Sequence, residues 1–162
     1  MELLLGNFRI GLGFDVHQIA KIKRPLILGG TVIPAPFGLD AVSDGDVVLH
    51  TIADAICGPC LLGDIGDHFP PEDKKNKGID SKKIVRFILG KIKKNYTIVN
   101  IDTTIIAEKP RLAEHKDRIT KSLARIFKTK RVNVKIKSKE GLDILGGKNA
   151  ISCMAVVLVK RK

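Results

Sequence analysis

Three residues of the sequence combine the types and the spacing of a metal site. Asp15 and His17 stand two positions apart at the end of an apolar stretch typical of a β-strand. On an extended chain both side chains therefore point to the same side. His50 follows in a segment with helical apolar spacing. Two imidazoles and one carboxylate can bind zinc and leave a fourth position open, as catalytic zinc sites do. An Asp-x-His pair alone is weak evidence, because such a histidine more often caps a turn.

The residues before His50 indicate where its helix begins. Ser43 is a suitable N-cap, and Asp46 three residues later can complete a variant capping box, which predicts a helix over residues 45–62. Free backbone amides at this helix start could receive a phosphate. Asp54 lies one helical turn after His50, and we expect it to fix the imidazole tautomer. The alternative for His50 is a core histidine that simply hydrogen-bonds to Asp54.

The elements that position these groups follow from apolar periodicity. Runs of branched apolar residues predict strands, and apolar residues at helical spacing predict helices. The strands are expected at 8–14, 25–33, 97–106, 131–137 and 152–159, and the helices at 45–62, 81–94 and 114–127. This order predicts one α/β (α+β) domain over residues 1–162, with residues 1–7 as a short extension. Its mixed β-sheet would carry the helices on one face, leaving the other face free for an oligomer.

The composition is that of a globular chain and limits the partners. The 162 residues are 44% apolar, enough for one domain with its own core. The formal net charge of +12 admits nucleic acid, an anionic surface or a phosphorylated substrate. Basic residues are spread along the chain, however, and one Tyr, six Phe and no Trp offer little for stacking on bases. We therefore expect a solvated basic surface and no specific nucleic acid.

No apolar run approaches the length of a membrane span, and the first residues show no export signal. We expect no membrane partner and a cytoplasmic location, with the processed form of an organelle protein as the open alternative.

The tetrapeptide Cys57-Gly58-Pro59-Cys60 matches the active site of thioredoxins. A reactive thiol of that kind needs exposure at a helix N-terminus, where its pKa is lowered. Cys57 instead falls late in the predicted helix, which Pro59 would end. We expect buried, inert cysteines, and the odd total of three argues against a disulfide framework. A thiol-redox function stays as the less favoured alternative.

Longer motifs follow one another in a single order over nearly the whole chain: GFDVH, ILGGTVIP, SDGDVVLHTIADAI, LGDIGDHFPPEDKKNKGIDS, NIDTTIIAEKPRL and RVNVKIKSKEGL. Together they resemble the 2-C-methyl-D-erythritol 2,4-cyclodiphosphate synthases of the non-mevalonate isoprenoid pathway. The resemblance implies a metal-dependent lyase that cyclises 4-diphosphocytidyl-2-C-methyl-D-erythritol 2-phosphate and releases CMP. It also implies a homotrimer with active sites at the subunit interfaces.

The resemblance further assigns individual residues. Asp15, His17 and His50 would hold Zn²⁺ or another divalent transition metal, and Asp15 and His17 would also touch the substrate. Glu140 would hold Mg²⁺ or Mn²⁺ bound with the substrate diphosphate. The catalytic positions are Val42 and Ser138. The implied substrate contacts are Val16, Val42 and Ser43; Asp64, Ile65, Gly66, Phe69, Pro70, Pro71, Glu72 and Asp73 for the methylerythritol end; Ala107, Glu108, Lys109, Pro110, Arg111 and Leu112 for cytidine; and Lys137, Ser138, Lys139, Glu140, Ile144 and Gly147 towards the phosphates.

Some positions depart from the family pattern. Val42 stands where the family usually has a histidine that is thought to assist the attacking phosphate, whereas Ser138 keeps the hydroxyl of the usual threonine. Gly147 replaces an arginine, for which the adjacent Lys148 is the obvious substitute, and Lys139 with its neighbour Lys137 would add cations beside the phosphates. The departure at Val42 leaves an alternative open: a member that binds metal and nucleotide but is catalytically impaired.

Overall fold

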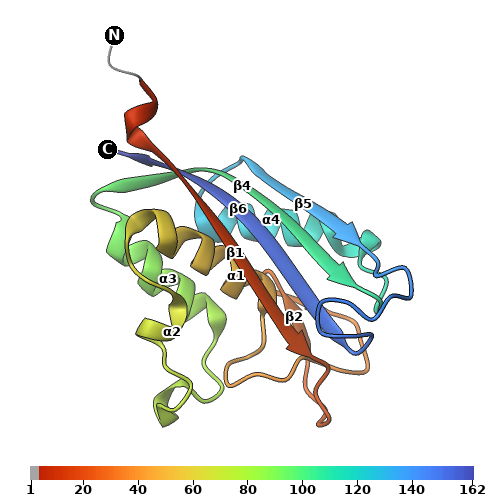
Figure 1. Ribbon diagram of the computed structural model, residues 1–162. Helices are drawn as coiled ribbons and strands as arrows, with labels where there is room; N and C mark the ends of the chain where they lie inside the picture. The colour runs from red at the N-terminus through yellow and green to blue at the C-terminus, as the bar shows by residue number, and fades with distance from the viewer. Residues whose placement is uncertain (1–3) are drawn as a thin grey trace.

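The structure, a computed structural model, describes residues 4–162 and contains a four-stranded mixed β-sheet with helices on one face, together with a separate two-stranded sheet of β2 and β3 (Figure 1). Its strands are β1 (Phe8–Gln18), β2 (Leu26–Leu28), β3 (Thr31–Ile33), β4 (Tyr96–Ala107), β5 (Val132–Lys137) and β6 (Ala150–Arg161). Its α-helices are α1 (Val47–Cys57), α2 (Ile65–His68), α3 (Ser81–Ile92) and α4 (Lys116–Phe127). Short 3₁₀ turns cover Leu4–Asn7, Gly58–Cys60, Lys74–Asn76 and Ala113–His115. Part of the predicted N-terminal extension, residues 1–3, lies outside the described residues.

The main sheet has the strand order β1-β6-β4-β5. Strand β6 is antiparallel to both β1 and β4, while β5 is parallel to β4. Strands β1, β4 and β5 therefore run in the same direction, as their arrows show in Figure 1. Because the carboxyl ends of parallel strands meet at one edge, the residues that follow these three strands share that edge of the sheet.

Helix α1 packs directly on β1, and two glycines make the close approach possible. A Cβ atom at Gly11 would lie 1.9 Å from the carbonyl oxygen of Ala55, and one at Gly13 would lie 2.0 Å from that of Thr51. Any side chain at these positions would push the helix away from the strand. All residues of α1 except Asp54 are buried. This packing fixes the position of α1 relative to the end of β1.

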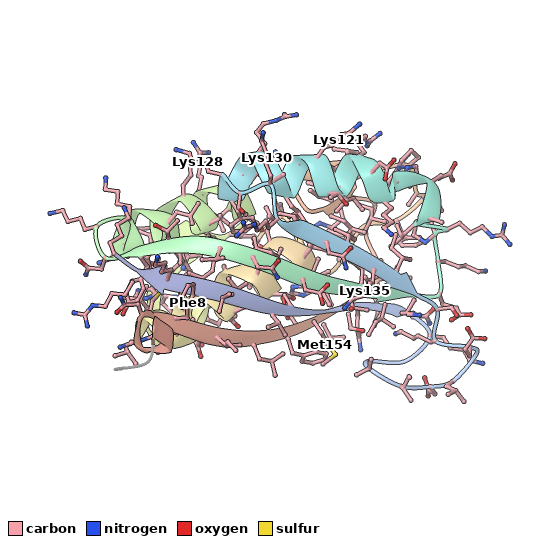
Figure 2. The ribbon with its side chains drawn as sticks, turned by 90° about the horizontal axis from the view of Figure 1, so that it is seen from above. Phe8, Lys121, Lys128, Lys130, Lys135 and Met154 are labelled. Atoms are coloured by element: carbon pink, nitrogen blue, oxygen red, sulfur yellow. The ribbon has the colours of Figure 1, made fainter. Side chains whose placement is uncertain are left out.

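The sheet face opposite the helices is apolar and exposed. Residues of β1 alternate, so that Gly11 and Gly13 face α1 while Ile10 and Leu12 are 72% and 65% exposed on the other side. Phe8, Phe14, Met154 and Val156 extend the same exposed apolar face over β1 and β6. Figure 2 shows Phe8 and Met154 near these strands, at a distance from Lys121, Lys128 and Lys130 around α4.

The predicted fold class, a mixed sheet with helices on one face, is confirmed. The single strand predicted over 25–33 is wrong, because Gly29 and Gly30 adopt positive φ angles of 60° and 72° and turn the chain into the β2–β3 hairpin. The helix predicted over 45–62 is also wrong at both ends. It begins after Asp46 rather than at Gly45, and it gives way after Cys57 to a 3₁₀ turn that contains Pro59.

Among the described residues, no helix is long and apolar enough to cross a membrane.

Candidate active site

Asp15, His17 and His50 converge, as the sequence predicts. Oδ2 of Asp15 lies 3.0 Å from Nε2 of His17 and 3.3 Å from Nδ1 of His50, and the two nitrogens are 3.3 Å apart. These are the only three residues of the described part that form such a cluster of metal-ligating side chains. Strand β1 supplies two of them and α1 the third, so the glycine-dependent packing of α1 on β1 builds the cluster.

The cluster has the dimensions of a tetrahedral zinc site. With bonds of about 2.0–2.1 Å, a tetrahedral zinc ion sets its ligand atoms about 3.3–3.4 Å apart. The observed separations of 3.0, 3.3 and 3.3 Å are close to this spacing. The three ligand atoms of Asp15, His17 and His50 would form one face of the tetrahedron, and the fourth ligand position would be open. The residues present therefore fit a catalytic divalent metal.

The Asp15 carboxyl is poised to remain ionised. Its partial burial acts to raise its pKa, but the hydrogen bonds and the charges of His17 and His50 outweigh burial and hold the pKa well below its usual value. Its second oxygen, Oδ1, accepts a hydrogen bond of 2.8 Å from the backbone N–H of Val16. The carboxylate is thus oriented with one oxygen on the backbone and the other towards the two imidazoles.

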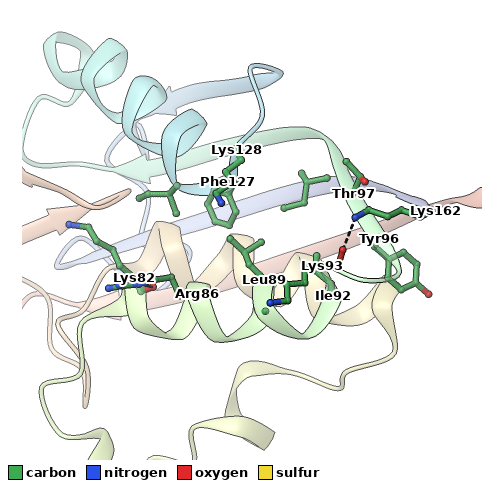
Figure 3. Close-up of a pocket in the computed structure, with 13 residues that line it drawn as sticks. Lys82, Arg86, Leu89, Ile92, Lys93, Tyr96, Thr97, Phe127, Lys128 and Lys162 are labelled. Atoms are coloured by element: carbon green, nitrogen blue, oxygen red, sulfur yellow. Dashed lines mark hydrogen bonds between the residues drawn. The ribbon is translucent and has the colours of Figure 1, made fainter.

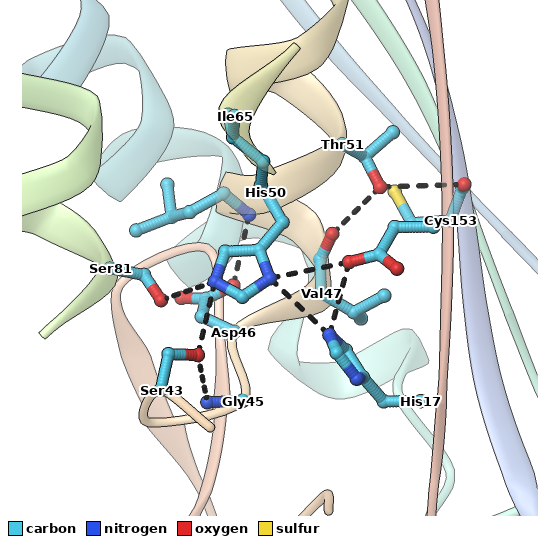
Figure 4. Close-up of polar contacts among 12 residues, drawn as sticks. His17, Ser43, Gly45, Asp46, Val47, His50, Thr51, Ile65, Ser81 and Cys153 are labelled. Atoms are coloured by element: carbon cyan, nitrogen blue, oxygen red, sulfur yellow. Dashed lines mark hydrogen bonds and ion pairs between the residues drawn. The ribbon is translucent and has the colours of Figure 1, made fainter. Parts of the chain in front are cut away.

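His50 contacts two serines on the side away from the cluster (Figure 4). Its Nε2 lies 2.8 Å from Oγ of Ser81 and 3.2 Å from Oγ of Ser43. Ser81 in turn donates its hydroxyl proton to Asp44, which also accepts the Ser81 backbone N–H at 3.1 Å. This chain of hydrogen bonds keeps the proton of His50 on Nε2 and leaves Nδ1 as a lone-pair donor for a metal.

The prediction that Asp54 orients His50 is therefore wrong. Asp54 accepts the backbone N–H of Ile65 at 2.8 Å and so fixes the start of α2. Ser81, the first residue of α3, takes the role instead. The contact between Ser81 and His50 spans 31 positions, so local spacing could not predict it. The only signal in the sequence is that Ser81 is the last residue of the motif LGDIGDHFPPEDKKNKGIDS.

Ser43 is likewise not the N-cap of α1. The helix is capped by Asp46, whose carboxylate accepts the N–H of Leu49 at 3.1 Å and that of Gly29 at 2.8 Å. Ser43 belongs to the loop before the helix, where its Oγ accepts the N–H of Gly45. Arg24, which the sequence analysis did not single out, donates to the carbonyl oxygen of Ser43 at 2.6 Å and holds this loop beside His50.

A small pocket of about 190 Å³ opens beside the cluster. It joins residues that the sequence predicts around the metal with residues predicted for the methylerythritol end of the substrate: His17, Val42, Ser43, His50, Ile65, Phe69 and Pro71. Val42 is 43% exposed on its rim, and as a valine it presents no side-chain donor there. Asp64 caps the short helix α2, and Gly66 lies within it. Pro70 accepts the side-chain amide of Asn76, and exposed Glu72 precedes Asp73, which caps the following 3₁₀ turn.

The residues predicted for cytidine and the phosphates lie elsewhere on the same sheet edge. Ala107 ends β4 and leads into the loop through Glu108, Lys109, Pro110, Arg111 and Leu112, with a cis peptide bond before Pro110. Lys137 ends β5. The two loops are joined because the carboxylate of Glu108 accepts the backbone N–H of Lys139 at 3.0 Å.

Lys139 is not a free cation, contrary to the expectation that it would add charge beside the phosphates. It is only 1% exposed, and its ammonium donates to the carbonyl oxygens of Leu145 at 3.2 Å, Ala150 at 2.9 Å and Gly147. Burial lowers the pKa of Lys139, against the opposing charges of Asp143 and Glu108. Lys139 therefore organises the loop that contains Ile144 and Gly147.

Glu140 and Ser138 contact each other through their side chains and are both exposed. No hydrogen bond or ion pair among residues 4–162 joins either of them to Asp15, His17 or His50. Three strand spacings separate β1 from β5, which corresponds to about 14 Å. Within one chain, the two halves of the predicted site thus lie at opposite ends of one sheet edge.

The cysteines do not favour the thiol-redox alternative. Cys57, Cys60 and Cys153 are all buried and unbridged. Burial raises the pKa of Cys57 to about 12, helped by the charge of Asp54, and that of Cys60 to about 11, although Arg9 opposes it. A reactive thiol requires the opposite shift. The expectation of buried, inert cysteines is confirmed.

Comparison with known proteins places this site in a family. The model of the YgbB family matches residues 8–160. A 2-C-methyl-D-erythritol 2,4-cyclodiphosphate synthase of Clostridium botulinum is 45% identical over 95% of this chain and 99% of its own, and one of Shewanella sediminis is 47% identical over 94% and 96%.

Solved structures agree with this assignment. A 2C-methyl-D-erythritol-2,4-cyclodiphosphate synthase superposes with a TM-score of 0.85 at 33% identity, covering 94% of this chain and all of the other. The IspF of Plasmodium falciparum in complex with CDP gives a TM-score of 0.81 at 34% identity, covering 96% and 97%. The chain therefore belongs to the YgbB family. Its homologues define an enzyme of the lyase type.

Proposed function

We propose that the chain converts 4-diphosphocytidyl-2-C-methyl-D-erythritol 2-phosphate to 2-C-methyl-D-erythritol 2,4-cyclodiphosphate and CMP. The observation that carries this proposal is the Asp15–His17–His50 cluster, which has the spacing of tetrahedral zinc ligands and stands beside a pocket. In the reaction, an oxygen of the 2-phosphate attacks the β-phosphorus, and the bond from that phosphorus to the oxygen of CMP breaks. No protein nucleophile is needed, so the enzyme contributes orientation and electrostatic stabilisation.

Asp15, His17 and His50 would hold Zn²⁺ or another divalent transition metal, and Glu140 would be the protein ligand of Mg²⁺ or Mn²⁺ bound with the diphosphate. When bound, such ions supply Lewis-acid charge to phosphate oxygens.

The chain's own residues bind and orient the substrate. Ile65, Phe69 and Pro71 would form the apolar walls against the methylerythritol carbons and exclude water there. The loop 107–112 would receive the cytidine, and the hydroxyl of Ser138 and the ammonium of Lys137 would contact the phosphates. Holding both phosphates of one flexible molecule together removes much of the entropic barrier to ring closure.

The separation of the two halves supports a homotrimer with shared sites. The cytidine loop after β4 and the phosphate segment after β5 lie two and three strand spacings from β1, about 10 Å and about 14 Å along the sheet edge, which suits a site completed by a neighbouring subunit. The exposed apolar face of Phe8, Ile10, Leu12, Phe14, Met154 and Val156 offers the surface for that contact. An apolar patch of this kind on a sheet is typical of an interface.

The decisive experiment is mass-spectrometric detection of the cyclodiphosphate after incubation of the protein with substrate, zinc and magnesium. Cyclodiphosphate that forms only with metal, and that is lost in His50→Ala, supports the proposal. Metal and nucleotide binding without product would instead support the catalytically impaired alternative.

Val42 is the position at which turnover can be improved. We expect Val42→His to raise kcat at unchanged zinc content, because a lost donor to developing charge costs about 2.7–4 kcal/mol. The matched control is Val32→His, at a position that is 58% exposed and outside the pocket. If Val42→His gains no activity over the parent, Val42 is not the limiting catalytic position.

A further inference from the structure

A second cavity lies away from the candidate active site. It is a groove of about 620 Å³ between α3, the end of α4 and the start of β4 (Figure 3). None of its lining residues belongs to the metal cluster, the pocket beside it or the substrate segments. It opens on the helical side of the molecule, so it stays accessible when the apolar sheet face is covered by other subunits.

The floor of the groove is aliphatic. Leu89 of α3, Ile98 of β4 and Ile126 of α4 are only partly buried, and their remaining surface lines the groove together with Ile92 and Phe127. Gly90 of α3 borders open space in the groove, because a Cβ atom there would meet no atom within 4 Å. The buried ring of Phe127, which is 3% exposed, offers no face for stacking a base, and the ring of Tyr96 has the guanidinium carbon of Arg9 5.7 Å from its centroid. This floor suits a hydrocarbon chain better than a nucleotide.

The rim of the groove is cationic throughout. Its charged residues are Lys82, Arg86, Lys93, Lys128 and Lys162, and no Asp or Glu lines it. None of these five forms an ion pair within residues 4–162. Figure 3 shows Lys82 and Arg86 towards one end of the groove, and Lys93 and Lys162 towards the other. Unpaired like charges around a concave apolar surface focus a positive potential that an anion would neutralise.

We infer that this groove binds a soluble amphiphilic anion, consisting of one aliphatic chain and a phosphate or carboxylate head. The volume lies within the range of small-molecule sites, about 300–1,000 Å³. Seven helical steps lead from Arg86 on α3 to Lys93, its C-cap, and span about 10 Å, so the groove takes a chain of medium length with its head on either cation group. The aliphatic floor would contact the hydrocarbon chain of such a ligand, and the cationic rim would bind its anionic head.

The test titrates decyl phosphate, below its micelle concentration, into the intact protein and follows binding by calorimetry. We expect saturable binding at one site per chain, weaker binding of decanoate, and none of decyl maltoside or inorganic phosphate. The first lacks the charge and the second lacks the chain.

Two variants probe the two parts of the groove. Lys93→Glu combined with Lys128→Glu should weaken binding at least 10-fold, and Gly90→Phe, which fills the groove from an exposed helix position, should weaken it similarly. The matched control is Lys121→Glu combined with Lys130→Glu, which makes the same charge change around α4 outside the groove and should change affinity less than 2-fold (Figure 2).

Equal loss in the control pair, or unchanged binding in Gly90→Phe, would overturn the inference in favour of diffuse charge attraction. Binding to vesicles of phosphatidylglycerol and phosphatidylcholine without binding of decyl phosphate would overturn it in favour of a membrane headgroup. Far-UV circular dichroism measured beside each titration shows whether the variants keep the native fold, whatever the result of the cyclase assay.

Discussion

His50 uses its two ring nitrogens for different partners, and this division favours a metal-binding cluster over a core hydrogen bond. Nδ1 faces Asp15 and His17, while Nε2 contacts the hydroxyl of Ser81. A buried histidine in an ordinary core needs one hydrogen-bond partner for each ring nitrogen. His50 instead has both a carboxylate and a second imidazole at Nδ1. Asp44 accepts the hydroxyl proton of Ser81 and so fixes the orientation of that hydroxyl towards His50.

Replacement of Ser81 therefore tests the metal site without touching a ligand. We expect Ser81→Ala to weaken zinc binding by about 10–100-fold, because loss of the group that orients a ligating histidine has effects of this size. Zinc affinity can be measured by competition with a chromophoric chelator. Ser122→Ala, on α4, is the control and should bind zinc like the parent. Parental zinc affinity in Ser81→Ala would show that Ser81 does not orient His50.

Lys139 acts through the loop that it holds rather than through its charge. We expect Lys139→Met to lower kcat/KM by at least about 10-fold, since three carbonyl oxygens lose their common donor and the loop of Ile144 and Gly147 loosens. Zinc content should stay unchanged, because the cluster lies at the other end of the sheet edge. Lys130→Met is the exposed control. A parallel fall in zinc content would point to general unfolding instead.

At the scale of elements, the start of α1 is tied to the β2–β3 hairpin. Asp46 caps the helix through the N–H of Leu49, and the same carboxylate accepts the N–H groups of Gly29 and Gly30. The Gly-Gly turn can bring two amides to one carboxylate because both residues have positive φ angles. One buried side chain therefore joins two elements that lie 16 to 17 positions apart.

Removing this carboxylate should destabilise the fold more than an ordinary cap does. We expect Asp46→Ala to lower the free energy of unfolding by more than about 2 kcal/mol, because buried N–H groups lose their only side-chain acceptor. Asp80→Ala is the matched control: Asp80 caps α3 through a single N–H, that of Lys82, and should cost about 1 kcal/mol. Urea denaturation measures both. Equal losses would mean that the hairpin contacts contribute nothing.

At the scale of the whole molecule, the two faces of the sheet differ: one packs against the helices in the core, and the other is an exposed apolar surface. The helices cover one face, whereas the alternating residues of β1 leave a row of apolar side chains on the other (Figure 1). The same sheet carries the candidate metal cluster at the end of β1 and the loop proposed for cytidine at the end of β4. Assembly through the exposed apolar face would bring the metal cluster of one chain next to the cytidine loop of its neighbour.

A charge on this face should separate the subunits. We expect Leu12→Glu to convert the assembly to monomers in light scattering and to abolish cyclase activity while each chain still binds zinc, because half of each site is lost. Ile22→Glu, at a position that is also exposed at 71% but lies outside the sheet, should leave size and activity unchanged. An active, parent-sized Leu12→Glu variant would contradict the shared site.

The sequence by itself determined the fold class, the three candidate metal ligands and the inert cysteines. Strand alternation, helical periodicity and the two-residue spacing of Asp15 and His17 are local properties, which neighbouring residues encode directly. The family motifs extended these local signals to a reaction and to a set of binding residues.

Only the tertiary structure decided which partner orients His50, where α1 begins and what Lys139 does. The sequence predicted Asp54 as the partner of His50 and Ser43 as the N-cap of α1. The structure instead places Ser81 on His50, and the Asp46 cap accepts the N–H groups of Gly29 and Gly30 from distant positions. The sequence predicted Lys139 as a free cation, whereas in the structure its ammonium donates to the carbonyl oxygen of Gly147 in the loop around it. Hydrogen bonds between distant segments depend on how helices pack on the sheet, and this packing has no signature in the spacing of neighbouring residues.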